Sequence, residues 1–141
     1  MNVYSMFEEA ALKSPKKIAI VHNEYKLSYD DIYTKVTQFS AYLYGKGIIR
    51  GSKVAIYEKQ GIDFVVVALS LAKIGAIIIP INTHITDADV SNTLAYIDVD
   101  FLIVSRSASE RLDGFGIDKS KVIYDDGAEK KQTISTEANN T

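Results

Sequence analysis

The sequence contains no cysteine and no tryptophan, and only 2 prolines and 8 glycines among 141 residues. The lack of cysteine excludes disulfide bonds, thiolate catalysis and metal sites built on cysteine ligands. An excess of charge of one sign is also missing, since 16 Lys and Arg balance 18 Asp and Glu and leave a net charge of −2. Without a basic surface the chain cannot grip a phosphate backbone, so we expect no nucleic-acid partner.

A secretory signal is absent too, because Glu8 and Glu9 occupy the place of an apolar stretch near the N-terminus. We therefore expect a cytoplasmic protein. What is present is an ordinary globular balance, with 47% hydrophobic and 24% charged residues. The length allows one domain with a buried core.

The longest apolar stretch covers residues 64–81 and has to be weighed as a membrane span. Lys73, Gly75 and Pro80 interrupt it. A span would have to bury the lysine and accommodate both breaks. A buried helix that stops at the glycine, followed by a buried strand, accounts for the same residues, so we expect no membrane span.

Hydrophobic periodicity predicts alternating helices and short strands. In the first helix Val3, Met6, Phe7 and Ala10 recur at helical spacing, and Ser28 and Thr86 are expected to cap later helices. Helices are predicted over residues 3–13, from 29 to Gly45 or Gly47, over 60–74 and from 87 onward. Strands are predicted over 17–21, 25–27, 53–57, 76–81, 100–104 and 121–124. The pattern predicts an α/β fold: a mainly parallel sheet with helices on both faces, plus a small N-terminal hairpin.

Residues 125–141 differ from the rest of the chain. They hold four acidic and two basic residues, which accounts for the whole net charge, and Ile134 is their only large apolar residue. Such a segment buries too little to offset the entropy of ordering. We therefore predict a folded part over residues 1–124 and a polar flexible tail or truncated linker over 125–141.

Few residues carry chemistry by themselves. The glycine-rich stretch 45–51 lies between a helix and a strand, which is the wrong order for a phosphate-binding loop. His22 falls in the hairpin corner, whereas His84 follows an apolar strand, where open α/β sheets bind ligands. The acidic pairs are expected at helix ends, at a strand start and in the tail rather than around a metal. They are Asp30 with Asp31, Asp87 with Asp89, Asp98 with Asp100 and Asp125 with Asp126.

The 9 tyrosines follow no basic-aromatic stripe. Five of them are expected at the rim of the core, with the ring buried and the hydroxyl in water. These are Tyr29, Tyr33, Tyr42, Tyr44 and Tyr57.

Four segments resemble the beginning of the adenylate-forming (AMP-binding, ANL superfamily) ligases, and most of all the acyl-CoA synthetases. Residues 14–20 (SPKKIAI) match the opening strand of these enzymes, and residues 27–32 (LSYDDI) match their first core motif. Residues 42–56 follow a further family stretch, and residues 71–82 (LAKIGAIIIPIN) match the second core motif. The resemblance covers about residues 3–104, and its four motifs occur in the family order.

The resemblance implies an enzyme of fatty acid metabolism that joins a carboxylate to ATP, releases pyrophosphate and transfers the acyl group from the adenylate to a thiol. It implies ATP, Mg and CoA as the cofactors of the complete enzyme. The phosphate loop ending in Pro-Lys-Gly, the adenine-binding motifs and the catalytic lysine of the family are not found in these residues. The chain is therefore expected to have no catalytic or metal-binding residue, to bind no cofactor itself and to be inactive alone.

One substrate clue comes from the same resemblance. Asn82 and Thr83 are typical of acyl-CoA synthetases, whereas peptide-synthetase adenylation domains usually have Asp-Pro there. His84 stands where arginine is common, at a position that faces the CoA nucleotide in some relatives. His84 is therefore the single candidate cofactor-binding residue.

Several interpretations remain open. The chain is expected to be the N-terminal scaffold segment of an acid–thiol ligase, with the rest of the large ligase domain as its partner and with self-association through exposed apolar surface. Part of a nonribosomal peptide synthetase adenylation domain is a second interpretation. A non-catalytic α/β interaction module is a third, and a small nucleotide-binding flavodoxin-like domain is a fourth.

Overall fold

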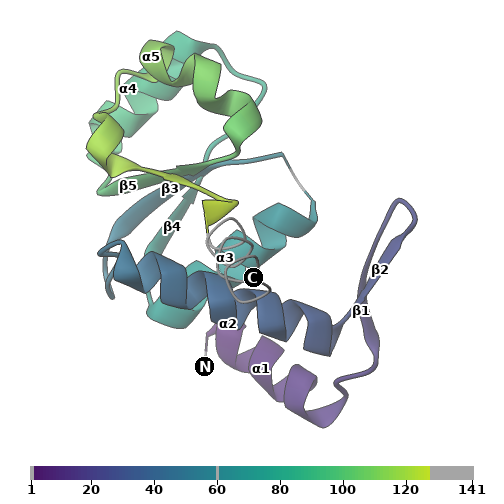
Figure 1. The fold of residues 1–141 in the computed structure, drawn as a ribbon. Helices are drawn as coiled ribbons and strands as arrows, with labels where there is room; N and C mark the ends of the chain where they lie inside the picture. Colours follow the sequence, from purple (N-terminus) through teal and green to yellow (C-terminus); the bar gives the residue numbers. More distant parts are fainter. Residues whose placement is uncertain (1, 60, 128–141) are drawn as a thin grey trace, which may run out of the picture. The chain divides into compact units, whose positions relative to one another are not determined.

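The structure is a computed structural model that describes residues 2–59 and 61–127 (Figure 1). The chain forms two compact units. Unit 1 comprises Met1–Ser52 and Lys59–Ile78, and unit 2 comprises Lys53–Glu58 and Ile79–Thr141. Each unit has a hydrophobic cluster of its own.

Unit 1 contains three helices and a hairpin. They are α1 (Val3–Lys13), β1 (Ile18–His22), β2 (Tyr25–Ser28), α2 (Tyr29–Gly45) and α3 (Ile62–Ile74). The hairpin strands pair antiparallel, and Ile32 and Val36 of α2 pack with Leu69 of α3 and Tyr4 of α1. Ile32 and Val36 lie four residues apart, so they occupy one face of α2 toward the cluster.

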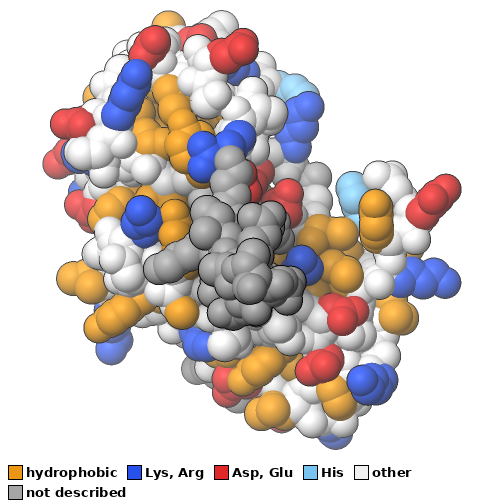
Figure 2. All heavy atoms as spheres, viewed as in Figure 1, with side chains coloured by type: hydrophobic (Ala, Val, Ile, Leu, Met, Phe, Trp, Pro, Cys, Tyr) orange, Lys and Arg blue, Asp and Glu red, His pale blue; other side chains and the backbone are white. Residues whose placement is uncertain are grey.

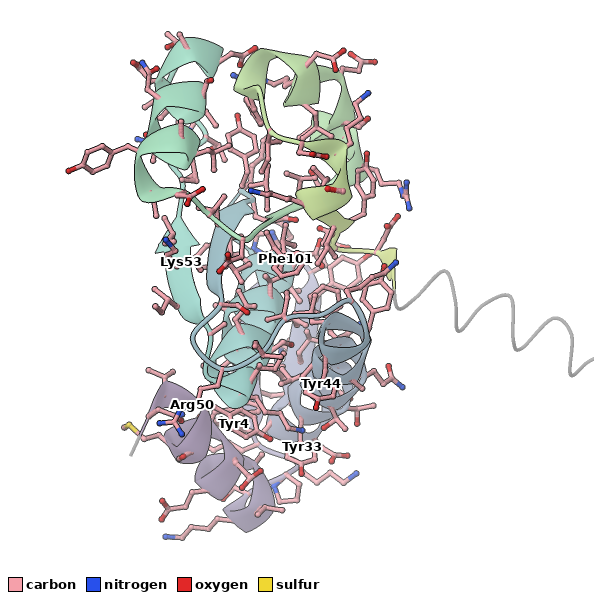
Figure 3. The ribbon with its side chains drawn as sticks, turned by 90° about the vertical axis from the view of Figure 1, so that its left-hand side faces the viewer. Tyr4, Tyr33, Tyr44, Arg50, Lys53 and Phe101 are labelled. Atoms are coloured by element: carbon pink, nitrogen blue, oxygen red, sulfur yellow. The ribbon has the colours of Figure 1, made fainter. Side chains whose placement is uncertain are left out.

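Helix α1 buries a different face from the one that its apolar spacing suggests. Val3 and Met6 are 67% and 61% exposed, whereas Tyr4 and Ala11 are buried. The hydroxyl of Tyr4 donates to Glu8 Oε2 at 2.9 Å, and Figure 3 shows Tyr4 beside Tyr33 of α2. Burial and the Glu8 carboxylate raise the pKa of Tyr4. An aromatic ring with a satisfied hydroxyl buries more area than Val3 or Met6 would, so this face turns inward.

The predicted caps at Ser28 and Thr86 and the predicted stop at Gly75 are confirmed. Ser28 and Asp31 form a reciprocal capping box at the start of α2, and the Thr86 hydroxyl accepts from the Asp89 amide at the start of the helix that follows it. Gly75 ends α3 with φ +91°, a left-handed conformation that favours glycine. The predicted start of this helix at Gln60 lies outside the described residues, and α3 begins at Ile62.

Four parallel strands form a sheet in the order β4-β3-β5-β6. They are β3 (Lys53–Tyr57), β4 (Ile77–Pro80), β5 (Phe101–Val104) and β6 (Val122–Tyr124); β4 is divided between the two units. In unit 2, Val90 and Leu94 of α4 (Asp87–Ile97) pack with Ala55 and Leu102 of the sheet. The α/β class, the parallel sheet and the separate hairpin are thus as the sequence predicts.

Three short elements between β5 and β6 escape the sequence patterns. They are the 3₁₀ helix η1 (Arg106–Arg111), helix α5 (Leu112–Phe115) and the 3₁₀ helix η2 (Lys119–Lys121). None is long enough to show a helical period. They nonetheless add Leu112 and Phe115 to the core of unit 2.

Strand β4 is an edge strand of the sheet. Hydrogen bonds from the two ends of this segment show which of its backbone N–H groups point toward β3. The amides of Ile77 and Ile81 donate to Ser52 O at 2.8 Å and to Ile56 O at 2.9 Å. Backbone N–H groups of successive residues in a strand point alternately to its two neighbours. Since Ile77 and Ile81 point toward β3, the backbone nitrogen of Pro80 points away from β3. Proline has no N–H to donate, and an outer edge tolerates it.

The apolar stretch 64–81 is divided between α3 and β4, as predicted. Among the described residues no helix is both long and apolar enough to cross a membrane.

Candidate functional site

The carboxyl ends of β3 and β5 are the place where a ligand site is expected in this sheet. From β3 the chain goes to β4 on one side, and from β4 to β5 on the other. Such a reversal of direction leaves a crevice beyond the carboxyl ends of the two adjacent strands. In unit 2, Tyr57 ends β3, and the segment Asn82–Thr86, here called the 82–86 loop, leads from β4 to α4.

The 82–86 loop presents His84 at the surface. Asn82 Oδ1 accepts from the His84 amide at 2.8 Å, which forms an Asx turn directly after the strand. His84 is exposed, and Thr86 caps α4 two residues later. The location predicted for His84 is therefore confirmed, while its contact with a nucleotide stays a prediction.

A network of polar side chains holds the base of this loop. Arg111 Nε donates to Asp87 Oδ1 at 2.9 Å, and Arg111 Nη1 donates to the Tyr57 hydroxyl. The Tyr57 hydroxyl in turn donates to the Thr83 carbonyl at 3.4 Å. The Asp87 carboxylate raises the pKa of Arg111, so the guanidinium stays charged. The network joins β3, the 82–86 loop, α4 and η1.

Helix α5 approaches this network closely. The Tyr57 ring lies 4.9 Å from the ring of Phe115, measured between centroids. A Cβ atom on Gly114 would lie 2.7 Å from Asp87 Oδ2, closer than real Cβ contacts allow. Only glycine at this position leaves Asp87 where Arg111 meets it.

A second arginine lies beyond β5. Arg106 Nε donates to Asp126 Oδ2 at 2.9 Å, and its guanidinium carbon lies 4.2 Å from the centre of the Tyr124 ring. The Asp125 amide donates to Val104 O at 2.9 Å. These two acidic residues belong to the segment predicted as a tail, and both contact other residues of unit 2, namely Val104 and Arg106; residues 128–141 of that segment lie outside the described residues.

The tyrosine prediction is wrong at two positions. Tyr44 is 68% exposed, so its ring is not buried. Tyr57 is buried, but its hydroxyl is bonded to protein rather than to water. Arg111, which satisfies this hydroxyl, is distant in sequence and belongs to η1, so no local pattern could reveal the pair.

One acidic residue at a helix start and one at a strand start have structural roles, as predicted. Asp31 closes the capping box, and Asp100 Oδ2 accepts from the Lys53 amide at 2.7 Å at the start of β3. Within residues 2–59 and 61–127, no group of three or more His, Asp or Glu side chains is placed to hold a metal ion. His22 ends β1, and its imidazole would lie 3.9 Å from a Cβ atom on Gly61 in the same unit.

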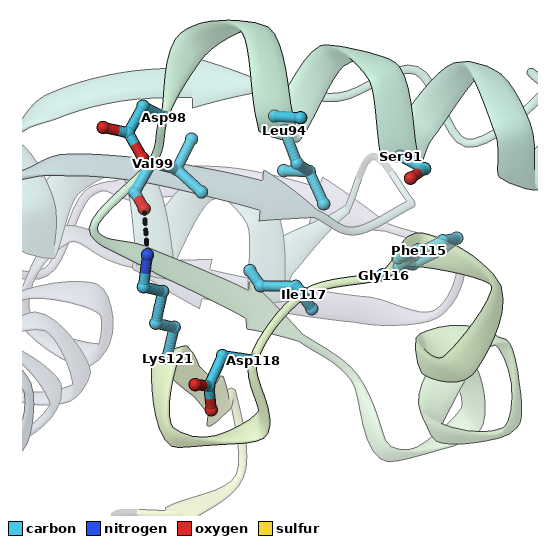
Figure 4. A pocket seen from close by; sticks show the side chains of 10 residues that line it. Ser91, Leu94, Asp98, Val99, Phe115, Gly116, Ile117, Asp118 and Lys121 are labelled. Atoms are coloured by element: carbon cyan, nitrogen blue, oxygen red, sulfur yellow. Dashed lines mark hydrogen bonds between the residues drawn. The ribbon is translucent and has the colours of Figure 1, made fainter.

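The amino ends of the strands are bound to the end of α4. Lys53 Nζ donates to Ile97 O at 3.0 Å, and Lys121 Nζ donates to Val99 O at 3.4 Å. Beside them lies a pocket of about 280 Å³ between α4 and the segment from Phe115 to Lys121 (Figure 4). Its lining is mixed: Leu94, Val99, Phe115 and Ile117 are apolar, whereas Ser91, Asp98, Asp118 and Lys121 are polar or charged. No sequence pattern indicates this pocket, because one of its walls comes from short elements that periodicity does not predict.

Comparison with known proteins identifies the family. The profile of the AMP-binding enzyme family matches residues 7–141. A medium/long-chain-fatty-acid–CoA/3-oxocholest-4-en-26-oate–CoA ligase of Mycolicibacterium smegmatis is 25% identical over 112 residues, which cover 79% of this chain and 20% of the ligase. Tyrocidine synthase 1 of Brevibacillus parabrevis is 25% identical over 125 residues, which cover 89% of this chain and 12% of the synthase.

The fold agrees with this match. The N-terminal domain of FACL13 from Mycobacterium tuberculosis superposes with a TM-score of 0.80 at 22% identity, over 92% of this chain and 34% of that one. The chain thus spans about a fifth of the mycobacterial ligase and a third of this solved domain. The parallel sheet, the separate hairpin and the profile match over residues 7–141 together show that the chain belongs to the AMP-binding enzyme family.

Proposed function

We propose that the chain is the N-terminal scaffold segment of an ATP-dependent acid–thiol ligase of the acyl-CoA synthetase type. In the complete enzyme a carboxylate would attack the α-phosphate of ATP, pyrophosphate would leave, and a thiol would then displace AMP from the acyl-adenylate. The residues of this chain would help to bind the thiol acceptor of the second step. The family match over residues 7–141 carries the proposal.

The 82–86 loop favours CoA as the thiol acceptor. Thr83 replaces the proline that usually follows in peptide-synthetase adenylation domains, and the Asx turn at Asn82 leaves His84 exposed beyond the carboxyl end of β4. An imidazole can donate to a phosphate oxygen and can add positive charge when protonated. We propose that His84 contacts a phosphate of the CoA nucleotide.

The described residues do not fit Mg-ATP. No cluster of possible metal ligands occurs in residues 2–59 and 61–127, and the carboxylates of Asp31 and Asp87 are held by a helix cap and by Arg111. The stretch 45–51 leads from α2 into β3 rather than from a strand into a helix, so it is no phosphate cradle. We assign no step of the reaction to ATP or Mg on this chain.

Carboxylate-dependent ATP–pyrophosphate exchange tests the scaffold assignment. We expect the purified 141-residue chain to show no exchange with fatty acids, aryl acids or amino acids. Exchange above the level of a heat-denatured sample would overturn the proposal that this segment is inactive alone.

Titration with adenosine 3′,5′-bisphosphate, which resembles the nucleotide part of CoA, tests the acceptor assignment. We expect chemical-shift changes at the 82–86 loop that His84→Ala abolishes and His22→Ala leaves unchanged. A peptide-synthetase adenylation domain, whose acceptor is a carrier protein, would show no such changes.

The alternative of a non-catalytic interaction module makes a different prediction. Such a module would be a monodisperse monomer with no use for a ligase partner and no response to the nucleotide. Both experiments, read together with the oligomeric state, therefore separate the three interpretations.

A further inference from the structure

We propose that Tyr57 and Arg111 are positioning residues that hold the 82–86 loop in place for contact with the thiol acceptor. That the loop contacts the thiol acceptor rests on the proposed function. That Tyr57 and Arg111 position the loop rests on the contacts within unit 2. Neither residue lies in the loop, and neither belongs to the motifs by which the sequence resembles its family.

Tyr57 is the direct link to the loop. Its hydroxyl donates to the Thr83 carbonyl and accepts from Arg111 Nη1, while its ring packs against Phe115 in the core. A hydroxyl that both donates and accepts has a fixed orientation. The core therefore holds the ring, and the ring holds the backbone of the loop one residue before His84.

Arg111 anchors the other end of the loop. Its guanidinium bonds to Asp87 with Nε and Nη2, so the first residue of α4 is fixed to η1. Gly114 leaves room for this contact, since any side chain there would collide with Asp87. The loop is thus held at both ends through Arg111: at Thr83 by way of Tyr57, and at Asp87 directly.

This arrangement leaves the turn itself free to face a ligand. The loop holds its own shape through the Asn82–His84 hydrogen bond, and Tyr57 and Arg111 set where that shape is placed. A phosphate ligand at His84 would then meet a preorganised turn, and less affinity would be lost to ordering the loop on binding.

Amide hydrogen exchange of the full chain tests the proposal, because the His84 amide is itself hydrogen-bonded and reports the turn. Tyr57→Phe removes only the hydroxyl and keeps the ring against Phe115. We expect exchange of the His84 amide to become about three- to tenfold faster, the effect of losing one hydrogen bond. The amides of β5 should keep their rates. Tyr124→Phe, at the end of β6 and outside the network, is the matched control and should change neither.

Arg111→Lys provides a second variant, since lysine keeps the charge but lacks the planar fork whose separate nitrogens bond to Asp87 and to Tyr57. It should also accelerate exchange at His84. Unchanged exchange in both variants overturns the proposal, as does an equal acceleration at His84 and in β5, which would mean a general loss of stability.

Titration of the same variants with adenosine 3′,5′-bisphosphate separates this proposal from the proposed function. Weaker binding by Tyr57→Phe, with unchanged binding by Tyr124→Phe, supports both. If the unaltered chain does not bind the nucleotide while Tyr57→Phe still accelerates exchange at His84, the CoA assignment fails and the positioning role stands.

Discussion

Gly75 and Gly45 both end helices, but only Gly75 has a backbone conformation and surroundings that favour glycine. Gly75 ends α3 with φ +91°, and a Cβ atom there would lie 3.1 Å from Arg50 Cγ. Gly45 ends α2 with nothing within 4 Å of such an atom. We expect Gly75→Ala to lower the free energy of unfolding by about 1–2 kcal/mol. Gly45→Ala should leave it unchanged or raise it by up to about 1 kcal/mol. Urea unfolding of both variants checks this, and equal effects would contradict it.

Asp31 gives the stability of the chain a defined dependence on pH. The Ser28 amide and hydroxyl hold the pKa of Asp31 below its ordinary value. A carboxylate with a lowered pKa stabilises the folded state above its unfolded pKa of about 3.9, and this contribution disappears as the pH falls through the lower, folded pKa. We therefore expect Asp31→Asn to destabilise the chain near neutral pH and to match the unaltered chain in strong acid.

Urea unfolding at a series of pH values measures this difference. Asp30→Asn is the control, since Asp30 lies in the same helical turn without the reciprocal bonds to Ser28. A difference between Asp31→Asn and the unaltered chain that persists unchanged in strong acid would show that the charge of Asp31 is not its cause.

Single residues could be predicted where their partner is close in sequence. Ser28 with Asp31 and Thr86 with Asp89 are separated by three residues, and Gly75 directly follows a helix. Tyr57 and Arg111 meet only because β3 and η1 are brought together by the fold. His84 could be placed after a strand, but the contacts that hold its loop could not.

At the scale of elements, α1 shows that apolar spacing alone does not determine which face of a helix is buried. The apolar residues of α1 fit two overlapping helical faces that share Phe7, and the structure buries the one with Tyr4. We expect Val3→Ala to change the free energy of unfolding by less than about 0.5 kcal/mol, because Val3 is exposed. Ile32→Ala should cost about 2–5 kcal/mol, because Ile32 is 1% exposed in the cluster of unit 1. A large effect of Val3→Ala in urea unfolding would contradict the observed face.

The long helices follow from periodicity, and strands β3 and β5 follow from short continuous apolar runs that are buried on both faces. The segment between β5 and β6 does not, since η1, α5 and η2 have 6, 4 and 3 residues. Arg106, Arg111 and the pocket beside Lys121 all depend on this segment. Most of what was missed at the candidate site therefore comes from one stretch without a readable period.

At the scale of the whole molecule, exposed apolar side chains indicate surfaces that a ligase domain would cover. In unit 1 they include Val3, Met6 and Leu12 of α1, and Val21 and Tyr25 of the hairpin; Figure 2 shows hydrophobic side chains at the surface of the hairpin. The hairpin packs Ala19, Ile20 and Leu27 against the cluster of unit 1 and leaves Val21 and Tyr25 exposed.

We predict that the isolated chain self-associates through these residues. Its sedimentation coefficient should rise with concentration, and Val3→Ser with Met6→Ser should reduce the rise, because less apolar area is left to bury between copies. Tyr96→Ser is the control, since Tyr96 is 92% exposed on α4 in unit 2. A constant sedimentation coefficient over the whole concentration range would contradict the prediction.

The proline of β4 limits what such association can become. Pro80 lies on the side of β4 away from β3 and has no N–H for an incoming strand. A sheet whose two edge strands can both pair with another copy can assemble head to tail into a fibre. Because Pro80 hinders pairing at the outer edge of β4, growth of that kind could not continue through this edge. The chain can therefore expose apolar surface without offering the outer edge of β4 as a template for strand addition.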